Sequence, residues 1–198
     1  MTTVLMIKGA EESLKYLDND IALLSKSFFD IGAKVEKVDG DKFSVLPKLN
    51  EIIDQLGSTD TLVVYYTGHG FFRNNRITFK LGEEQRNADY LPVEELISNI
   101  SSAPTDSVVL IFDCCSAVAA EVAWKNYASD KHMLFLPSER VESAEEIEEY
   151  QASFFTYCIH RALNSKVPSL YDNSYITLEK LYAVVKENAI RNCNSKLK

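Results

Sequence analysis

The chain has 198 residues, of which 46% are hydrophobic and 25% are charged, a composition that excludes a disordered chain, a collagen-like repeat and a coiled coil. This length is typical of about one domain and is sufficient for a sizeable core. The 21 Lys and Arg residues and 29 Asp and Glu residues give a formal net charge of −8, which argues against a basic nucleic-acid-binding surface.

Short apolar runs alternate with helical patterns along the N-terminal half of the chain. Strands are predicted at Thr3–Lys8, Val35–Val38 and Thr61–Tyr66. Amphipathic helices are predicted between them at Asp18–Ile31 and Phe43–Leu56, with Asp18 or Asn19 placed to cap the first helix. The run TLVVYY has no polar face, which is typical of a strand buried on both sides in a parallel sheet.

The C-terminal half continues this alternation. We predict a small hairpin at Arg73–Leu81, strands at Ser107–Phe112 and His132–Leu136, and helices at Pro92–Ile100, Ala117–Asn126, Ala152–Leu163 and Leu178–Ala189. Strands alternating with helices predict an α/β fold, a three-layer arrangement in which helices flank a mostly parallel central sheet. We expect one domain over residues 1–198. The acidic run at 139–149 is interpreted as a solvated loop or helix face.

Two of the predicted buried strands end in reactive side chains. Thr67-Gly68-His69-Gly70 follows the run TLVVYY, and Asp113-Cys114-Cys115-Ser116 follows SVVLIF. Open α/β sheets place their sites at the carboxyl ends of strands, and a helix start after Cys115 favours a thiolate there. If the strands are neighbours, an imidazole faces a thiol, as a cysteine nucleophile and its base require.

Each of these residues also has a structural interpretation. Taken alone, His69 is a histidine in a Gly-rich turn, and Cys115 is a small buried hydrophobic residue. Their joint placement, each after a buried β-branched strand, favours the catalytic interpretation.

The sequence resembles the metacaspases and related caspase-fold (clan CD) cysteine peptidases. YYTGHG resembles their histidine motif and IFDCCSA resembles their cysteine motif, in the same order. The segments 14–24, 134–162 and 177–182 resemble further family stretches, so the resemblance covers nearly the whole chain. The family usually has a glycine shortly after the cysteine, where this chain has Ser116-Ala117-Val118.

The resemblance implies a role for each residue that matches a motif. His69 would be the general base and Cys115 the nucleophile that forms a thioester. The backbone N–H groups of Gly70 and Cys115 would form the oxyanion hole. Cys114 is the rival nucleophile, but neighbouring strand residues point to opposite faces, so we expect Cys114 to lie in the core.

The resemblance also implies a preference for a basic residue before the cut bond. Asp113 stands where true caspases have a glutamine, and Leu14 stands where they have an arginine. Metacaspases and paracaspases line this S1 pocket with acids, which here match Asp20 and Asp113, with Glu142 as a weaker third candidate. Asp20 also fits a helix N-terminal acid, and Asp113 also fits a turn residue bonded to the backbone.

The implied protein is a cysteine endopeptidase that cleaves after Arg or Lys. Its partners would be protein or peptide substrates and an activating partner or upstream protease, with the chain a monomer or a homodimer. We expect no metal, no cofactor and no calcium dependence, because no dense Asp cluster is present. The cysteine usage and the lack of a long apolar run predict a cytoplasmic protein without a membrane span. The alternatives are a catalytically weak regulatory scaffold of the same fold and a flavodoxin-like binding module.

Overall fold

Five parallel strands form the central sheet of the computed structural model, in the order β2-β1-β3-β7-β8. The structure describes residues 1–73, 76–84, 86–127, 132–136, 145–164, 171–172, 175–177 and 179–187. The strands of this sheet are β1 (Thr2–Lys8), β2 (Lys34–Val38), β3 (Thr61–Gly68), β7 (Ser107–Cys114) and β8 (His132–Phe135). Its two central strands, β3 and β7, are those predicted from continuous apolar runs.

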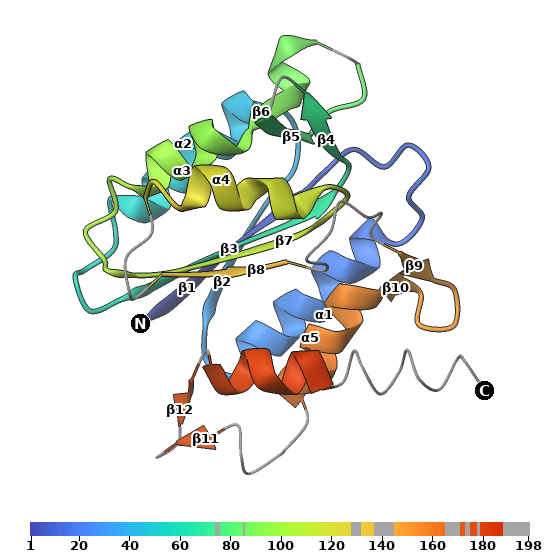
Figure 1. Cartoon of the computed structure of the whole chain (residues 1–198). Coiled ribbons are helices and arrows are strands. Elements are labelled where there is room, and N and C mark those ends of the chain that lie inside the picture. Colours follow the sequence, from blue (N-terminus) through green and yellow to red (C-terminus); the bar gives the residue numbers. More distant parts are fainter. Residues whose placement is uncertain are drawn as a thin grey trace.

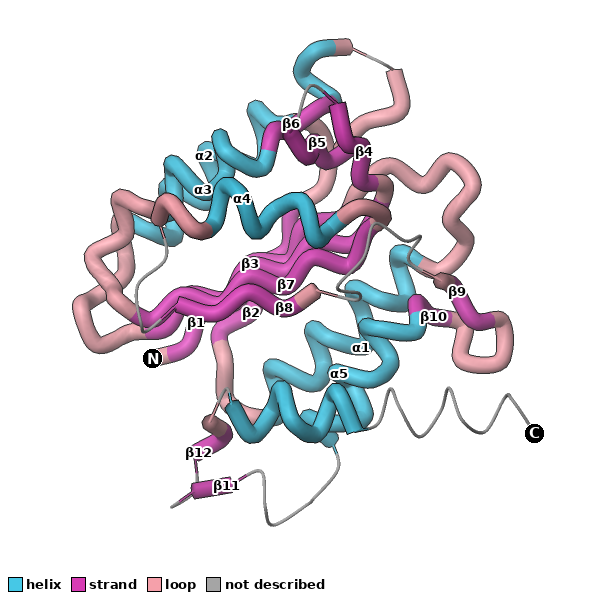
Figure 2. Tube along the Cα trace, viewed as in Figure 1, coloured by secondary structure: helices cyan, strands magenta, loops and turns pink. Residues whose placement is uncertain are grey.

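Helices cover both faces of this sheet (Figures 1 and 2). One face carries α2 (Lys42–Ile53), α3 (Val93–Ile100) and α4 (Ala120–Trp124), the last preceded by a 3₁₀ turn, η2 (Ala117–Ala119). The other face carries α1 (Leu17–Asp30) and α5 (Phe154–Asn164), and residues 179–187 form a further helix whose Leu181 and Val185 pack into the same core. This confirms the predicted three-layer α/β fold.

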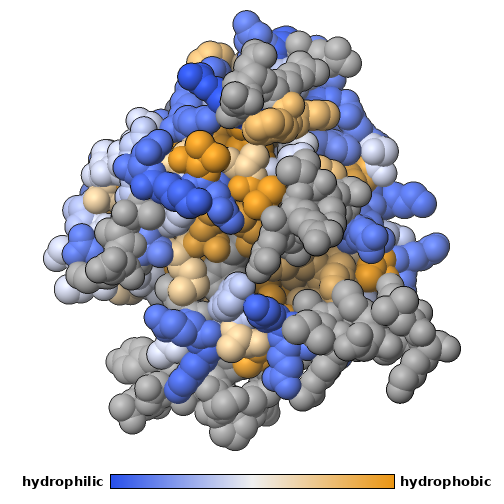
Figure 3. Space-filling view, viewed as in Figure 1, coloured by the Kyte–Doolittle hydropathy of each residue, from blue (hydrophilic) through white to orange (hydrophobic). Residues whose placement is uncertain are grey.

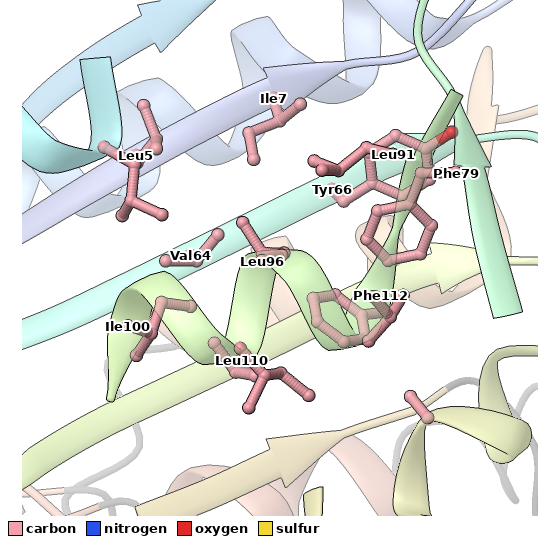
Figure 4. Packing of buried hydrophobic residues seen from close by; sticks show 14 of the residues in the cluster. Leu5, Ile7, Val64, Tyr66, Phe79, Leu91, Leu96, Ile100, Leu110 and Phe112 are labelled. Atoms are coloured by element: carbon pink, nitrogen blue, oxygen red, sulfur yellow. The ribbon is translucent and has the colours of Figure 1, made fainter. Parts of the chain in front are cut away.

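The alternation of side chains along the strands divides the interior into two cores. Leu62, Val64 and Tyr66 of β3 point toward α2, α3 and α4, whereas Val63 and Tyr65 point toward α1 and α5. In the first core, the Tyr66 ring stacks on Phe79 with centroids 3.8 Å apart, beneath the apolar side of α3 (Figure 4). Burial of β3 on both faces explains why its run TLVVYY contains no charged residue.

Among the described residues, three smaller antiparallel sheets lie outside the central sheet. One is a three-stranded sheet of β4 (Gly70–Arg73), β5 (Arg76–Lys80) and β6 (Tyr90–Pro92), with the 3₁₀ turn η1 (Asn87–Asp89) between β5 and β6. The other two are strand pairs, β9 (Glu146–Ile147) with β10 (Ala152–Ser153) and β11 (Tyr171–Asp172) with β12 (Tyr175–Ile176). The predicted hairpin is therefore part of a larger sheet. The predicted helix at Ala152 begins two residues later, because Ala152 and Ser153 pair with β9.

Apolar surface runs across the middle of one face of the molecule, over α4 and the β8 edge of the sheet, with hydrophilic residues around it (Figure 3). The strand β8 is the last in the order of the described central sheet. Among the described residues, no helix is long and apolar enough to cross a membrane.

Candidate active site

A cavity of about 220 Å³ opens at the carboxyl ends of β3 and β7. Its walls include four of the residues singled out from the sequence, namely Asp20, His69, Asp113 and Cys115. The remaining wall comes from the segment between β1 and α1, from the start of α1, from the end of β3, from β9 and from β10. The fold therefore brings together residues that are up to 95 positions apart in these predicted motifs, at the edge where open α/β sheets carry their sites.

The register of the two central strands places the histidine beside the cysteine. Strand β3 pairs with β7 in parallel, and its last pair joins Gly68 to Cys114. The next residue of each strand is therefore His69 on one side and Cys115 on the other. Both line the same cavity, as the sequence predicted for neighbouring strands.

The turn that carries His69 requires glycine on both sides. Gly68 has a φ of +149°, a conformation that side chains with a Cβ rarely adopt. A Cβ on Gly70 would collide with the carbonyl oxygen of Cys115 and would lie 2.8 Å from the Cys114 sulfur. The two glycines therefore allow the His69 turn to lie directly against the cysteine pair.

Backbone contacts fix the position of His69. Its carbonyl oxygen accepts a hydrogen bond from the Tyr66 hydroxyl at 2.8 Å and another from the backbone N–H of Lys80 at 3.0 Å. The Tyr66 hydroxyl also lies 3.0 Å from the carbonyl oxygen of Lys80. These bonds tie the turn to β5, so the imidazole projects from a backbone that is held at two points.

The His69 ring is placed to accept a proton. Burial lowers its pKa below the usual value, and the charge of Glu146 opposes part of this effect. The ring is therefore neutral at pH 7, which is the form that a general base needs. Its Nε2 atom is buried and has no hydrogen-bond partner among the described residues.

The two adjacent cysteines point to opposite sides of the strand end. Cys114 is fully buried in the core beneath α3 and α4, and burial raises the pKa of its thiol well above the usual value. Cys115 is partly exposed and lines the cavity. The expected core position of Cys114 is confirmed.

The residue after Cys115 adopts a left-handed conformation. Ser116 has a φ of +58° and a ψ of +17°, and its carbonyl oxygen accepts the Ala119 N–H in the 3₁₀ turn η2. A glycine near this point, as in the related sequences, would adopt this conformation without strain. The chain thus keeps a sharp turn after Cys115 with a serine at the strained position.

Two buried aspartates form one side of the cavity. Asp20, from the first turn of α1, accepts the backbone N–H of Ser153 at 2.9 Å and the Thr67 hydroxyl at 3.1 Å. Burial, followed by the nearby charge of Asp113, raises the pKa of Asp20 to about 8. Asp20 is therefore more than an acid at a helix start, because its side chain is buried against the strand ends.

Asp113 is bonded through only one of its oxygens. Its Oδ2 atom accepts hydrogen bonds from the Ser153 hydroxyl, from the Thr156 hydroxyl at 2.6 Å and from the Thr156 N–H at 3.1 Å. Its Oδ1 atom is buried and has no hydrogen-bond partner among the described residues. Burial raises the pKa of this carboxyl above its usual range, opposed by these hydrogen bonds. One oxygen of a buried acid thus remains available to a donor.

A third acid of the cavity, Glu146, was not predicted from the sequence. Its carboxylate accepts the backbone N–H groups of Lys15 at 2.9 and 3.0 Å and of Tyr16 at 2.9 Å, immediately before α1. Glu142, which the sequence suggested for this role, lies outside the described residues. The run of glutamates near position 146 has no feature that distinguishes one of them, because the contact partners are 130 residues away.

The expected cap of α1 was wrong. The N-cap position is Tyr16, which makes no side-chain capping hydrogen bond, and Asp18 lies inside the first turn and forms an ion pair with Lys8 at 2.8 Å. The carboxylate of Glu146 supplies acceptors to the N–H groups just before the helix instead. A residue distant in sequence replaces the local cap.

The remaining predictions concern residues outside the dyad. Leu14 lines the cavity, and Trp124 lies in the core. His160 bonds to Ser27 and Asn164 and is not among the residues that line the cavity, in keeping with a structural role. Within the described ranges, no group of three or more His, Cys, Asp or Glu side chains is arranged to hold a metal ion.

A family model described as the caspase domain matches residues 4–188, nearly the entire chain. A search of curated proteins finds no match.

Proposed function

The chain belongs to the caspase-domain family of cysteine peptidases, and on this premise we propose that it is an endopeptidase that cleaves protein chains after arginine or lysine. The observation that carries the basic specificity is the buried Oδ1 of Asp113, which has no hydrogen-bond partner among the described residues and belongs to the wall of the cavity that also contains Cys115. A basic substrate side chain would give this oxygen a hydrogen-bond donor and would also place a positive charge beside the acids of the cavity.

The proposed reaction uses the two residues at the strand ends. His69 takes the thiol proton of Cys115, and the thiolate sulfur attacks the carbonyl carbon of the substrate. The resulting oxyanion is bound by the backbone N–H groups of Gly70 and Cys115, two residues whose backbones pack closely against each other. His69 then gives its proton to the leaving amine, and water hydrolyses the thioester with His69 as base.

The proposed specificity rests on the three acids of the cavity. A guanidinium group offers five N–H donors in a planar fork, and an ammonium group offers three. Leaving a buried acceptor without a donor costs about 1–3 kcal/mol, so a basic side chain that reaches Asp113 Oδ1 recovers that free energy. Glu146 adds negative charge to the same cavity, and Asp20 adds more as pH rises through its pKa of about 8. This charge disfavours an acidic side chain.

The test is cleavage of matched fluorogenic peptides that differ only in the residue before the cut bond, with Arg, Lys and Asp as the three choices. We expect cleavage after Arg and Lys, loss of that cleavage in Cys115→Ala, and the same rates with calcium or with a chelator. Cleavage after Asp alone would contradict the acidic pocket and leave the dyad intact.

The alternative is a regulatory scaffold without catalysis. It predicts that no peptide is cleaved and that an arginyl chloromethylketone does not label Cys115. A chain that is labelled at Cys115 but cleaves no peptide has a competent site and is a latent enzyme, so labelling separates the two cases.

A further inference from the structure

A carboxylate from the segment between β1 and α1 lies between His69 and a buried lysine. The Oε2 atom of Glu12 is 3.9 Å from Nε2 of His69, and its Oε1 atom forms an ion pair with the Lys80 ammonium group. The Lys80 side chain is 3% exposed, and the His69 side chain is 18% exposed. The motifs of the strand ends do not include Glu12, and nothing in its sequence surroundings distinguishes it from Glu11.

We propose that Glu12 is a positioning residue for His69, acting at the ring nitrogen that does not exchange a proton with Cys115. This inference rests on the proposed function. When His69 takes the thiol proton, both ring nitrogens become donors, and Nε2 has no hydrogen-bond partner among the described residues. Glu12 Oε2 is the acceptor that the structure places near this atom. The thiol proton then passes to Nδ1, while Glu12 holds the Nε2 proton and fixes the ring.

The backbone holds Glu12 at this place. The N–H of Gly9 donates to the Thr67 carbonyl at 2.9 Å, and the N–H of Ala10 donates to the Lys80 carbonyl at 3.0 Å. Lys80 in turn donates its own N–H to the His69 carbonyl. The segment with Glu12 and the turn with His69 are therefore both bonded to the same residue of β5.

The conformation of Glu12 is consistent with a functional constraint. Its φ is +35°, in the region that residues with a Cβ adopt rarely and at a cost of order 1–3 kcal/mol. Such a conformation persists where surrounding contacts hold it, and Glu12 forms an ion pair with the buried Lys80. The strain accompanies a carboxylate that lies beside the ring of His69.

The distance of 3.9 Å between Glu12 Oε2 and His69 Nε2 is too long for a hydrogen bond. We assign this arrangement to the resting state of the enzyme. His69 is neutral there because burial lowers its pKa. Formation of the imidazolium adds a charge that attracts Glu12, and a shift of about 1 Å closes the hydrogen bond, as catalytic contacts commonly tighten in the reacting complex.

Other charged and titratable groups also face His69 and have separate partners. Glu146 of β9 raises the pKa of His69, but its carboxylate is bonded to the N–H groups before α1. Asp20 of α1 and Asp113 of β7 are bonded at Ser153, and Cys115 is the proposed nucleophile. The ammonium group of Lys80 offsets part of the charge of Glu12 without removing it.

The opposite charges of Glu12 and Lys80 give a test with two signs. In a Cys115→Ala background, the titration of His69 is followed by NMR of the imidazole ring, with a His69→Asn spectrum for assignment. Glu12→Gln should lower the midpoint of this titration by about one pH unit, since a carboxylate beside the ring stabilises its charged form. Lys80→Met should raise the midpoint, because Glu12 then acts without an opposing charge.

The matched control is Glu11→Gln. Glu11 is the neighbour of Glu12 on the same segment but forms an ion pair with Lys8 at 2.7 Å. This variant should leave the His69 midpoint and the peptide cleavage rate unchanged. The variant Glu12→Gln leaves the buried Lys80 without its partner, so the double variant Glu12→Gln with Lys80→Met provides a folded form that lacks both charges.

In peptide cleavage, Glu12→Gln and the double variant should lower kcat by about tenfold, with little change in KM, because one pH unit corresponds to a tenfold loss of imidazolium. A midpoint that does not move, or that moves the same way in Glu12→Gln and Lys80→Met, would overturn the role of Glu12. The NMR titration needs no substrate. If the wild type cleaved no peptide but the two variants shifted the His69 midpoint in opposite directions, the result would count against the proposed peptidase activity. It would leave the contact between Glu12 and His69 in place.

Discussion

Asp20 and Asp113 are joined through a single residue, Ser153. The backbone N–H of Ser153 donates to Asp20, and the Ser153 hydroxyl donates to Asp113. Ser153 is the last residue of β10 and immediately precedes α5, so the start of this helix sets the spacing of the two acids. Two buried carboxylates held this close raise the free energy of each other's charge, and a cation between them lowers it.

Recognition of a basic side chain should strengthen as pH rises. Burial and the charge of Asp113 raise the pKa of Asp20 to about 8, so the site gains negative charge as pH increases through that value. The measurement is kcat/KM for a peptide with Arg relative to the same peptide with citrulline, which is neutral and similar in shape. Because the ratio cancels the titration of the dyad, it should rise between pH 7 and 9 and level above that range. In Asp20→Asn it should be lower and flat, and a ratio that is flat in wild type would exclude this role of Asp20.

The free energy of unfolding should also depend on pH because of the raised pKa of Asp20. A carboxyl with a raised pKa in the folded state favours the folded form below its unfolded pKa, and this advantage is lost as pH rises through the folded pKa. Asp20→Asn removes this dependence. The free energy of unfolding of Asp20→Asn relative to wild type should therefore become more favourable from pH 5 to pH 9, by about 1 kcal/mol or more. Urea unfolding at three pH values measures the difference, and a constant difference would contradict the buried state of Asp20.

The two cysteines should separate activity from stability. Cys115→Ala should abolish cleavage and change the free energy of unfolding little, because Cys115 faces the cavity. Cys114→Ala should retain cleavage and lose about 1 kcal/mol of stability, because it removes a fully buried sulfur from the core. Peptide cleavage and thermal unfolding of both variants provide the comparison. If Cys114→Ala lost cleavage but kept a normal unfolding curve, the nucleophile would be Cys114 and not Cys115.

A methyl group at Gly70 should displace the site. A Cβ there collides with the Cys115 carbonyl, so Gly70→Ala must move the backbone that carries the nucleophile. We expect a loss of kcat of about 100-fold, since small misplacements at a reacting centre have effects of this size. Gly57→Ala is the control, because its nearest contact is the Asp60 carboxylate at 3.5 Å. Equal effects in both variants would show that the chain merely tolerates no added methyl group.

Glu146→Gln should weaken substrate binding and loosen the segment before α1. The carboxylate accepts two backbone N–H groups there, and hydrogen bonds to a charged group contribute about 1.5–3 kcal/mol. We expect a higher KM for the Arg peptide and lower thermal stability. Glu149→Gln, an exposed glutamate of the same acidic run, serves as the control and should behave as wild type. Identical behaviour of both variants would remove Glu146 from the site.

The sheet could be predicted from the sequence because its central strands are buried on both faces. Apart from their first residues, Thr61 and Ser107, the runs TLVVYY and SVVLIF are hydrophobic throughout, and the parallel register then brings the residues after them together. The short pair of β9 and β10 could not be predicted in this way. Its strands have two residues each, too few for any period to show.

The site could be predicted where local chemistry marks a residue and not where a distant contact does. His69 lies between two glycines that its turn requires, and Asp113 lies at the end of a buried strand, directly after its apolar run. Glu146 and Glu12 are glutamates among other glutamates, and only their contacts with Lys15 and Lys80 distinguish them. Side-chain contacts made across the fold leave no periodic trace in the sequence.

Asp113 and Cys115 leave the same strand two residues apart. Two residues of extended chain span about 7 Å, and β7 is paired on both sides, with β3 and with β8. Under the proposed function, the sulfur that attacks the carbonyl and the acid that binds the side chain are therefore at a fixed interval. Such an interval selects substrates by side-chain length as well as by charge. Ornithine, whose side chain is one methylene group shorter than that of lysine, has the same positive charge but would not reach the Asp113 carboxylate.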